Sequence, residues 1–227
     1  DVLDHLRLEG FNRLSMGVQD FNKEVQRLVN REQDEAFIFA LLNHARDIGF
    51  TSTNIDLIYG LPKQTPQSFA YTLQKVAELN PDRLSVFNYA HLPTLFAAQR
   101  KIKDADLPSA EQKLDILQET IVSLTAAGYQ FIGMDHFARP DDSLAQAQRQ
   151  GTLQRNFQGY SSHAQCDLIG LGVSAISRID DLYAQNPTQL AAYEAALDEG
   201  RLATVKGVRL NKDDLMRRDV IERLMCD

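Results

Sequence analysis

Polar side chains lie at the ends of three apolar segments in the first ninety residues of this 227-residue chain. Gln19 ends the first segment, Asp56 lies within the second (residues 53–65), and Asn88 with Tyr89 ends the third. The second segment stops at a glycine and a proline, which predicts a strand buried on both faces. Because Asp is rare in strands and costly to bury alone, Asp56 requires a partner: a structural cation, a pair of backbone amides or a ligand.

Helical patterns separate these segments. Apolar residues recur at helical spacing over 35–48, and Thr65-Pro66, a capping residue with a first-turn proline, opens the next helix. Strands that alternate with helices predict parallel βαβ units, whose carboxyl ends carry the binding residues. We therefore expect Gln19, Asp56 and Asn88 to meet in a ligand site; a purely structural hydrogen-bond network is the alternative.

After Ala90 the alternation stops. His136, between Asp135 and Arg139, follows a strand candidate at 129–134 and is interpreted either as a hydrogen-bonded loop histidine or as a site residue. The remaining expected elements are a basic segment at 91–110, a helix at 110–127, a solvated helix at 141–150, a loop at 156–160, helices at 190–197 and 213–225, and a small hairpin at 201–210.

Two other patterns offer little chemistry. Gly170-Leu171-Gly172 lacks the third glycine and the acidic partner of a dinucleotide-binding loop, so we expect these glycines to let the backbone pass close to a ligand or another strand. No serine stands in the Gly-x-Ser-x-Gly setting of a nucleophile elbow. Spacing alone therefore predicts a barrel-like enzyme fragment without defining its reaction.

The composition narrows the class of protein. A formal net charge of -7 argues against a general nucleic-acid surface. No apolar run approaches the roughly 18 residues of a membrane span, and no signal-peptide pattern is present, so we expect a cytoplasmic protein. The two cysteines, Cys166 and Cys226, form neither a zinc motif nor a disulfide framework. Both ends lie inside helical patterns, so we expect a piece of a longer polypeptide.

Several motifs resemble the radical S-adenosylmethionine enzymes of tetrapyrrole synthesis. They are Arg13–Asp20, Asn30–Arg31, Asn54–Pro62 and Leu84–Ala90. Three further motifs make the chain similar to the oxygen-independent coproporphyrinogen III oxidase family of bacteria: Gly133–Pro140, Arg155–Tyr160 and Gly170–Ser177. The resemblance covers essentially the whole chain.

This resemblance implies an α/β fold, with the second half of an incomplete (β/α)6 barrel at 1–108 and a smaller, mainly helical C-terminal region at 109–227. It also implies oxidative decarboxylation of two propionates of coproporphyrinogen III, which gives the vinyl groups of protoporphyrinogen IX in haem biosynthesis. In the family, a 4Fe–4S cluster and S-adenosylmethionine, bound as two molecules, generate a 5′-deoxyadenosyl radical for this step. The implied partners are the substrate and an electron donor such as a flavodoxin or ferredoxin, with neither nucleic acid nor membrane, and the protein is expected to be a monomer.

Site residues carried over from the family belong to the cofactor sites. Gln19, Arg31 and Asp56 match contacts of the second S-adenosylmethionine molecule, and the other matches are Ala90 and Ile176 for the first molecule and Ile58, Phe157 and Gln158 as neighbours. The residue chemistry agrees with these roles. An aspartate accepts bonds from a ribose, a glutamine bonds in both directions, and an arginine pairs with a carboxylate through two bonds.

One departure from the family is large. Its Cys-x-x-x-Cys-x-x-Cys cluster motif, a glycine-rich stretch and an acidic residue are missing here, and we expect them upstream of Asp1. The chain as given is therefore expected to bind no cluster, to hold no metal and to be inactive alone. The alternatives are a haem-chaperone relative of the same superfamily and a tetrapyrrole-binding module without turnover.

Overall fold

A computed structural model describes residues 2–156, 159–163 and 166–226. Contacts divide the chain into two compact units, Asp1–Gln146 (unit 1) and Ala147–Asp227 (unit 2). The boundary predicted between residues 108 and 109 falls inside unit 1, because the helix that follows it packs against an earlier helix of the same unit. None of the described helices is both long enough and apolar enough to cross a membrane.

Unit 1 is organised around a five-stranded sheet. Its strands lie in the order β1 (Arg13–Gln19), β2 (Ser52–Tyr59), β3 (Arg83–Asn88), β5 (His136–Ala138) and β4 (Gln130–Gly133). The first three are parallel, whereas β5 pairs antiparallel with both β3 and β4. The predicted alternation of strands and helices is thus confirmed for the first ninety residues. Within the described residues the fold is mixed α/β, and the sheet is not closed into a barrel.

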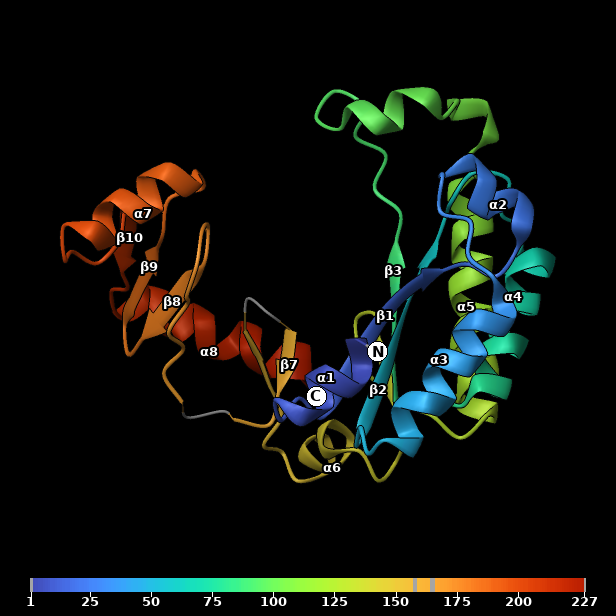
Figure 1. The fold of residues 1–227 in the computed structure, drawn as a ribbon, viewed down its shortest axis with the longest axis horizontal. Helices are drawn as coiled ribbons and strands as arrows, with labels where there is room; N and C mark the ends of the chain where they lie inside the picture. Colours follow the sequence, from blue (N-terminus) through green and yellow to red (C-terminus); the bar gives the residue numbers. More distant parts are fainter. Residues whose placement is uncertain (1, 157–158, 164–165, 227) are drawn as a thin grey trace. The chain divides into compact units, whose positions relative to one another are not determined.

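Helices α3 (Glu35–Asp47), α4 (Pro66–Leu79) and α5 (Ala110–Ala126) lie along the same side of the parallel strands (Figure 1). The predicted cap at Thr65 is confirmed, since it forms a capping box with Ser68 at the start of α4, and Ser109 forms one with Gln112 at the start of α5. The smaller elements of this unit are α1 (Val2–Leu8), α2 (Lys23–Leu28), the 3-10 turns η1 (Ala97–Lys101) and η2 (Asp104–Asp106), and α6 (Ser143–Arg149), which spans the boundary to unit 2.

The hydrophobic core of unit 1 lies between this helical layer and the sheet. Along β2, Ile55 and Leu57 are fully buried, whereas Asn54, Asp56 and Ile58 are partly exposed. The prediction that this strand is buried on both faces is therefore wrong. Apolar side chains project toward the helices at every second position, and the face between them carries the polar residues.

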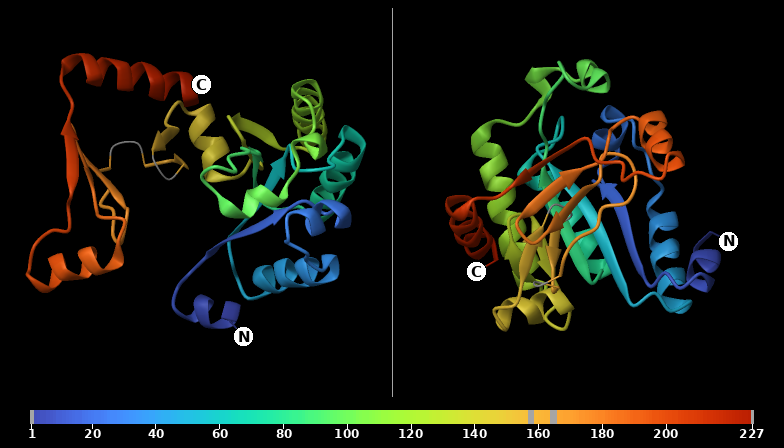
Figure 2. Two further views of the ribbon diagram at one scale, coloured as in Figure 1. Left: turned by 90° about the horizontal axis from the view of Figure 1, so that it is seen from above. Right: turned by 90° about the vertical axis from the view of Figure 1, so that its left-hand side faces the viewer.

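The described residues of unit 2 include two antiparallel sheets and two complete helices. The larger sheet is β10 (Lys206–Arg209), β9 (Leu182–Gln185) and β8 (Ile176–Ile179), and the smaller pairs β6 (Gln154–Asn156) with β7 (Gly159–Ser161). The left view of Figure 2 shows α7 (Leu190–Asp198) and α8 (Lys212–Cys226) beyond opposite ends of the larger sheet. These strands accompany the helices of the C-terminal region, which was expected to be mainly helical.

Three local predictions are also corrected. His136 lies in β5 rather than in a loop, and the predicted loop at 156–160 contains the end of β6 and the start of β7. The predicted hairpin at 201–210 is a single strand, β10, which pairs with β9. By contrast, the close approach predicted at Gly170 and Gly172 is confirmed at Gly170, since a Cβ there would lie 2.8 Å from the carbonyl oxygen of Ile176 in β8. It is wrong at Gly172, where a Cβ would meet no atom of the described residues within 4 Å.

Candidate functional site

The carboxyl end of β1 is bent and strained at Gln19. The register of β1 against β2 shifts between Gly17 and Gln19, which is a bulge, and Gln19 adopts a left-handed φ of 68°. Residues other than glycine rarely adopt this conformation, and a bulge changes the direction of a side chain. Backbone strain of this kind concentrates at binding sites, where the surrounding structure holds it in place.

The next residue, Asp20, fixes this end of the strand. Its carboxylate accepts bonds from the backbone N–H of Asn22 (2.7 Å), the hydroxyl of Thr72 (2.5 Å) and the side-chain amide of Gln64. The Gln64 amide also donates to the carbonyl oxygen of Ile58 (2.9 Å), so the ends of β1 and β2 are joined through one buried network. Burial raises the pKa of Asp20 above its ordinary value, although the donors around it act in the opposite direction.

Gln19 folds back over Gly17 beside Arg31. A Cβ at Gly17 would lie 2.6 Å from Nε2 of Gln19 and 3.4 Å from Nη2 of Arg31, so the side chains need a glycine here. The carbonyl oxygen of Gly17 accepts bonds from Arg31 Nη2 (3.1 Å) and Gln33 Nε2 (3.0 Å). Oε1 of Gln19 is buried and has no hydrogen-bond partner among the described residues. A buried unsatisfied acceptor is costly, and a donor on a ligand would relieve that cost.

Asp56 lies one strand away, opposite Gly17 in the register of β1 and β2. Its partners among the described residues are two side chains. Asn54 Nδ2 donates to Oδ1 at 2.7 Å, and the Ser15 hydroxyl lies 3.4 Å from Oδ2. Because a carboxylate has about four acceptor positions and the second bond is long, Asp56 retains capacity for a further donor.

The same register row continues across the sheet. Asp56 lies opposite Ser85 in β3, and Ser85 lies opposite His136 in β5. The His136 ring makes an edge contact with Phe87 at 5.9 Å between centroids. Sequence reasoning missed this row because β5 has only three residues, and its pairing with β3 leaves no periodic signal in the chain.

After β3 the chain extends to the 3-10 turns, as Figure 1 shows in green. The hydroxyl of Tyr89 lies 3.1 Å from Nδ1 of His91, and burial raises the pKa of Tyr89. The carbonyl oxygen of Ala90 accepts a bond from Nε2 of Gln99 (3.0 Å). Gln99, which sequence reasoning did not single out, therefore holds the segment after β3 in place.

A cavity of about 560 Å³ lies at this end of the strands, within the roughly 300–1,000 Å³ typical of small-molecule sites. It brings together three of the residues selected from the sequence: Gln19, Arg31 and Ile58. The rest of its lining combines cations, amides and apolar groups: Arg27, Leu28, Val29, Asn30, Leu61, Tyr89, Ala98, Gln99, Lys101 and Ile102. With three cationic side chains and no carboxylate in its lining, the cavity suits a ligand that carries an anionic group and an apolar or aromatic part.

The other selected residues lie elsewhere. Asp56, Asn88 and Ala90 are neighbours of the cavity in register or sequence but do not line it, so the predicted meeting of Gln19, Asp56 and Asn88 in one cavity is not observed. Ile176 begins β8 in unit 2. Phe157 and Gln158 lie outside the described residues.

The described residues offer no evident ligand set for a metal. No group of three or more His, Cys, Asp or Glu side chains among them could hold a metal ion. Cys166 is exposed and Cys226 is buried, and neither forms a disulfide with another described residue. Thiolates hold the irons of iron–sulfur clusters, so this donor set does not fit a cluster.

Comparisons with known proteins agree on one family. The model of the Radical SAM superfamily matches residues 1–76. The chain is 78% identical over all 227 residues to an oxygen-independent coproporphyrinogen III oxidase of Salmonella typhimurium, and 50% identical over 218 residues to one of Thermostichus vulcanus. It covers 50% of the first relative and 67% of the second.

A solved structure gives the same result. It is described as coproporphyrinogen III oxidase from Escherichia coli, a radical SAM enzyme, and it matches the whole chain with 76% identity and a TM-score of 0.95. The match covers 52% of that structure's chain. The chain therefore spans about half the length of its Salmonella relative and of this structure.

Proposed function

Since the chain belongs to the oxygen-independent coproporphyrinogen III oxidase family, we propose that the full-length protein that contains it converts coproporphyrinogen III to protoporphyrinogen IX. Each of two propionate side chains loses a hydrogen atom from its β-carbon, carbon dioxide and one electron, and becomes a vinyl group. The proposal concerns the full-length protein, because the chain spans about half of its Salmonella relative. An electron donor of the flavodoxin or ferredoxin type, a monomeric state and a cytoplasmic location are part of the proposal.

The observation that carries the proposal is the buried, unpartnered Oε1 of Gln19 at the edge of a 560 Å³ cavity. This acceptor lies beside the Arg31 guanidinium and within a strained bulge. S-adenosylmethionine offers an ammonium group, ribose hydroxyls and an adenine amine as donors, and a carboxylate as an anion. The cavity residues therefore fit this molecule.

We assign the following roles to the chain's own residues. Arg31 holds the carboxylate of S-adenosylmethionine, and Gln19 accepts a bond from one of its donors. Asp56 accepts a further bond on the same face of the sheet, while Ile58 packs against the apolar part. The chemistry supplied by bound S-adenosylmethionine is hydrogen-atom abstraction from the substrate, and the protein contributes orientation and exclusion of water.

The remaining assigned positions are also proposals. Ala90 and Ile176 would line the S-adenosylmethionine molecule at the cluster, with Phe157 and Gln158 as neighbours of these sites. No step is assigned to a cluster within this chain, because its described residues do not fit one. The number of bound S-adenosylmethionine molecules, two in this proposal, is open to direct counting.

Anaerobic turnover of the full-length protein tests the proposed function. The protein is incubated with coproporphyrinogen III, S-adenosylmethionine and a reductant, and protoporphyrinogen IX and 5′-deoxyadenosine are measured by chromatography. We expect both products to form together, and omission of S-adenosylmethionine to abolish both. Absence of protoporphyrinogen together with tight haem binding would favour a haem-chaperone function and reject the proposal.

A further inference from the structure

A second cavity, of about 440 Å³, lies entirely within unit 2 beneath α8. Residues of β6, β8, β9 and α8 line it, among them four arginines: Arg155, Arg178, Arg217 and Arg218. Two carboxylates also line it, so the lining carries a formal charge of +2, although the chain as a whole carries -7. An anion would find a complementary environment here.

Both carboxylates of the lining already have partners. Glu222 pairs with Arg178 at 3.0 Å, with both side chains largely buried. Asp214 accepts a bond from the backbone N–H of Asn211 (3.0 Å) at the start of α8. Among the described residues, neither carboxylate forms an ion pair with Arg155, so neither neutralises its positive charge.

Arg155 is held in place but incompletely bonded. Its guanidinium lies over the Tyr160 ring at 4.9 Å, and the Tyr160 hydroxyl donates to the carbonyl oxygen of Met225 (2.7 Å). These contacts join the β6–β7 pair to the end of α8 and fix the direction of the arginine. Nη1 of Arg155 is buried and has no hydrogen-bond partner among the described residues. Such a donor is costly to bury, and a carboxylate is the partner that guanidinium binds best.

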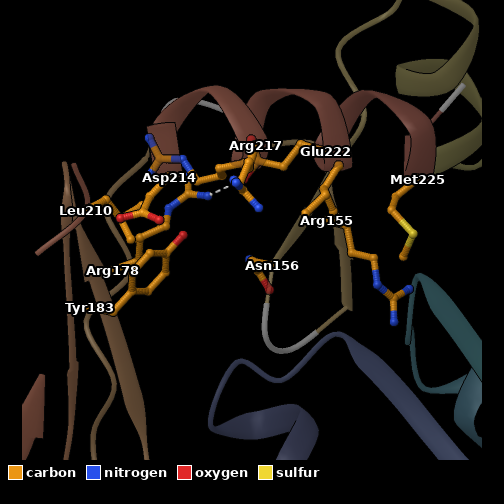
Figure 3. Close-up of a pocket in the computed structure, with 11 residues that line it drawn as sticks. Arg155, Asn156, Arg178, Tyr183, Leu210, Asp214, Arg217, Glu222 and Met225 are labelled. Carbon is orange, nitrogen blue, oxygen red and sulfur yellow. Dashed lines mark hydrogen bonds and ion pairs between the residues drawn. The ribbon is translucent and has the colours of Figure 1, made fainter. Parts of the chain in front are cut away.

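The lining also contains apolar side chains, those of Leu210, Ile221 and Met225. Figure 3 shows Arg155 and Met225 at one end of the cavity and Leu210, Arg178 and Tyr183 at the other. Ile221 of α8 adds a further apolar side chain. A small hydrated anion gains nothing from these groups, whereas an amphipathic molecule uses both the charge and the apolar surface.

We propose that this cavity binds a carboxylate of an amphipathic ligand, with Arg155 as the residue that recognises the carboxylate. The inference stands on unit 2 alone and does not depend on the reaction proposed above. A tetrapyrrole propionate and the carboxylate of a fatty acid share this chemistry.

Binding of two probes to the full-length protein tests the inference. The probes are coproporphyrin III, followed by its fluorescence, and decanoate, followed by calorimetry, each compared with its methyl ester. Arg155→Leu removes the charge, and Arg201→Leu is the matched control, because Arg201 is exposed, pairs with Glu199 and does not line the cavity. We expect at least one of the free acids to bind at least 10-fold more weakly to Arg155→Leu than to the wild type, with no change in the control.

The esters provide the second arm. Each ester should bind the wild type no better than its acid binds Arg155→Leu, and the acid that binds more tightly identifies the source of the carboxylate. Equal affinity in Arg155→Leu and Arg201→Leu, or esters that bind as tightly as acids, would overturn the proposal. Because no turnover is measured, failure of the proposed reaction and failure of this site remain distinguishable.

A second variant tests the proposal even if Arg155→Leu does not fold. Ile221 is 58% exposed, so Ile221→Glu should fold normally, as circular dichroism will check. It places a carboxylate in the lining and should weaken acid binding at least 10-fold. Unchanged binding in a folded Ile221→Glu protein would also contradict the proposal.

Discussion

Gly17→Ala is expected to separate ligand binding from folding at the end of β1. The new Cβ would meet only the far ends of two side chains, Nε2 of Gln19 at 2.6 Å and Nη2 of Arg31 at 3.4 Å. The φ of Gly17 lies outside the left-handed region, so alanine can adopt the same backbone conformation. The Gln19 amide must retreat by about 0.8 Å to reach an ordinary contact of 3.4 Å. The substitution therefore moves the proposed ligand contact of Gln19, leaves Arg31 at an ordinary contact distance and does not disturb the core.

The size of the effect follows from the contacts. Loss of one hydrogen bond to the ligand costs roughly 1–1.5 kcal/mol, which is about a 10-fold rise in the Kd for S-adenosylmethionine. The free energy of unfolding should change by less than about 1 kcal/mol, because alanine also restricts the unfolded chain. Anaerobic equilibrium dialysis of the full-length protein measures the Kd, and urea denaturation measures the stability.

Gly170→Ala is the contrasting variant. Its Cβ would lie 2.8 Å from the backbone carbonyl oxygen of Ile176, which cannot move without disturbing β8. We expect about 1–3 kcal/mol of destabilisation there. If Gly17→Ala is instead the destabilised variant, or if its Kd is unchanged, the role assigned to Gln19 is refuted.

Three further predictions concern single carboxylates and a phenol. Asp20→Asn should lower the free energy of unfolding by about 1–3 kcal/mol, because the new amide would face the Gln64 amide. Burial raises the pKa of Asp20 above 3.8, so the contribution of Asp20 to the free energy of unfolding falls as the pH rises from 3.8 through that raised pKa. Urea titrations at several pH values should show this pH dependence in the wild type but not in Asp20→Asn. The same pH dependence in both proteins would contradict the assignment. Burial raises the pKa of Tyr129 from 10.0 to about 12, so the free energy of unfolding should fall as the pH rises from 10 to 12, and it should fall less steeply in Tyr129→Phe. At neutral pH this variant should lose about 1–2 kcal/mol of stability, because the Pro81 carbonyl loses its hydrogen-bond donor. Absorbance at 295 nm and urea titration measure these effects, and a Tyr129 pKa near 10 would contradict the prediction. Asp56→Ala in the full-length protein should raise the apparent KM for S-adenosylmethionine with iron content unchanged, and unchanged kinetics would leave Asp56 with a structural role.

The sequence predicted the elements whose signals are local. The capping pair at Thr65-Pro66 and the helical period over 35–48 both correspond to observed helices, α4 and α3. Alternation of these helices with apolar segments predicted the parallel strands correctly. Of Gln19, Asp56 and Asn88, which were expected to meet at the ends of these strands, only Gln19 lines the cavity. Each of these signals lies within a window of about fifteen residues, in which helix propensity and hydrophobic periodicity determine the secondary structure.

Features created by distant pairing could not be predicted. β5, β6 and β7 have three residues each, too few for a period, and they exist because of partners elsewhere in the chain. The buried acceptor of Gln19 depends on a bulge and on the approach of Arg31 from another segment. In the sequence, Asp20 is only the last residue of a motif. Its role in joining β1 to β2 depends on hydrogen bonds from Thr72 and Gln64, which are distant in the chain.

The arginine-lined cavity of unit 2 shows the same limit. Arg155 and Arg178 are 23 positions apart, and α8 supplies six further residues of the lining from beyond residue 210. No spacing rule connects these segments. Their common environment arises from the pairing of β8 with β9 and the packing of α8 on β6.

Dialysis of S-adenosylmethionine against the full-length protein carrying Gln19→Leu tests the central claim most directly. Gln74→Leu is the matched control, because Gln74 is exposed on α4 and does not line the cavity. The account predicts that Gln19→Leu raises the Kd of one bound S-adenosylmethionine about 10-fold or more, while Gln74→Leu leaves every site unchanged. Equal binding by the two variants would contradict it.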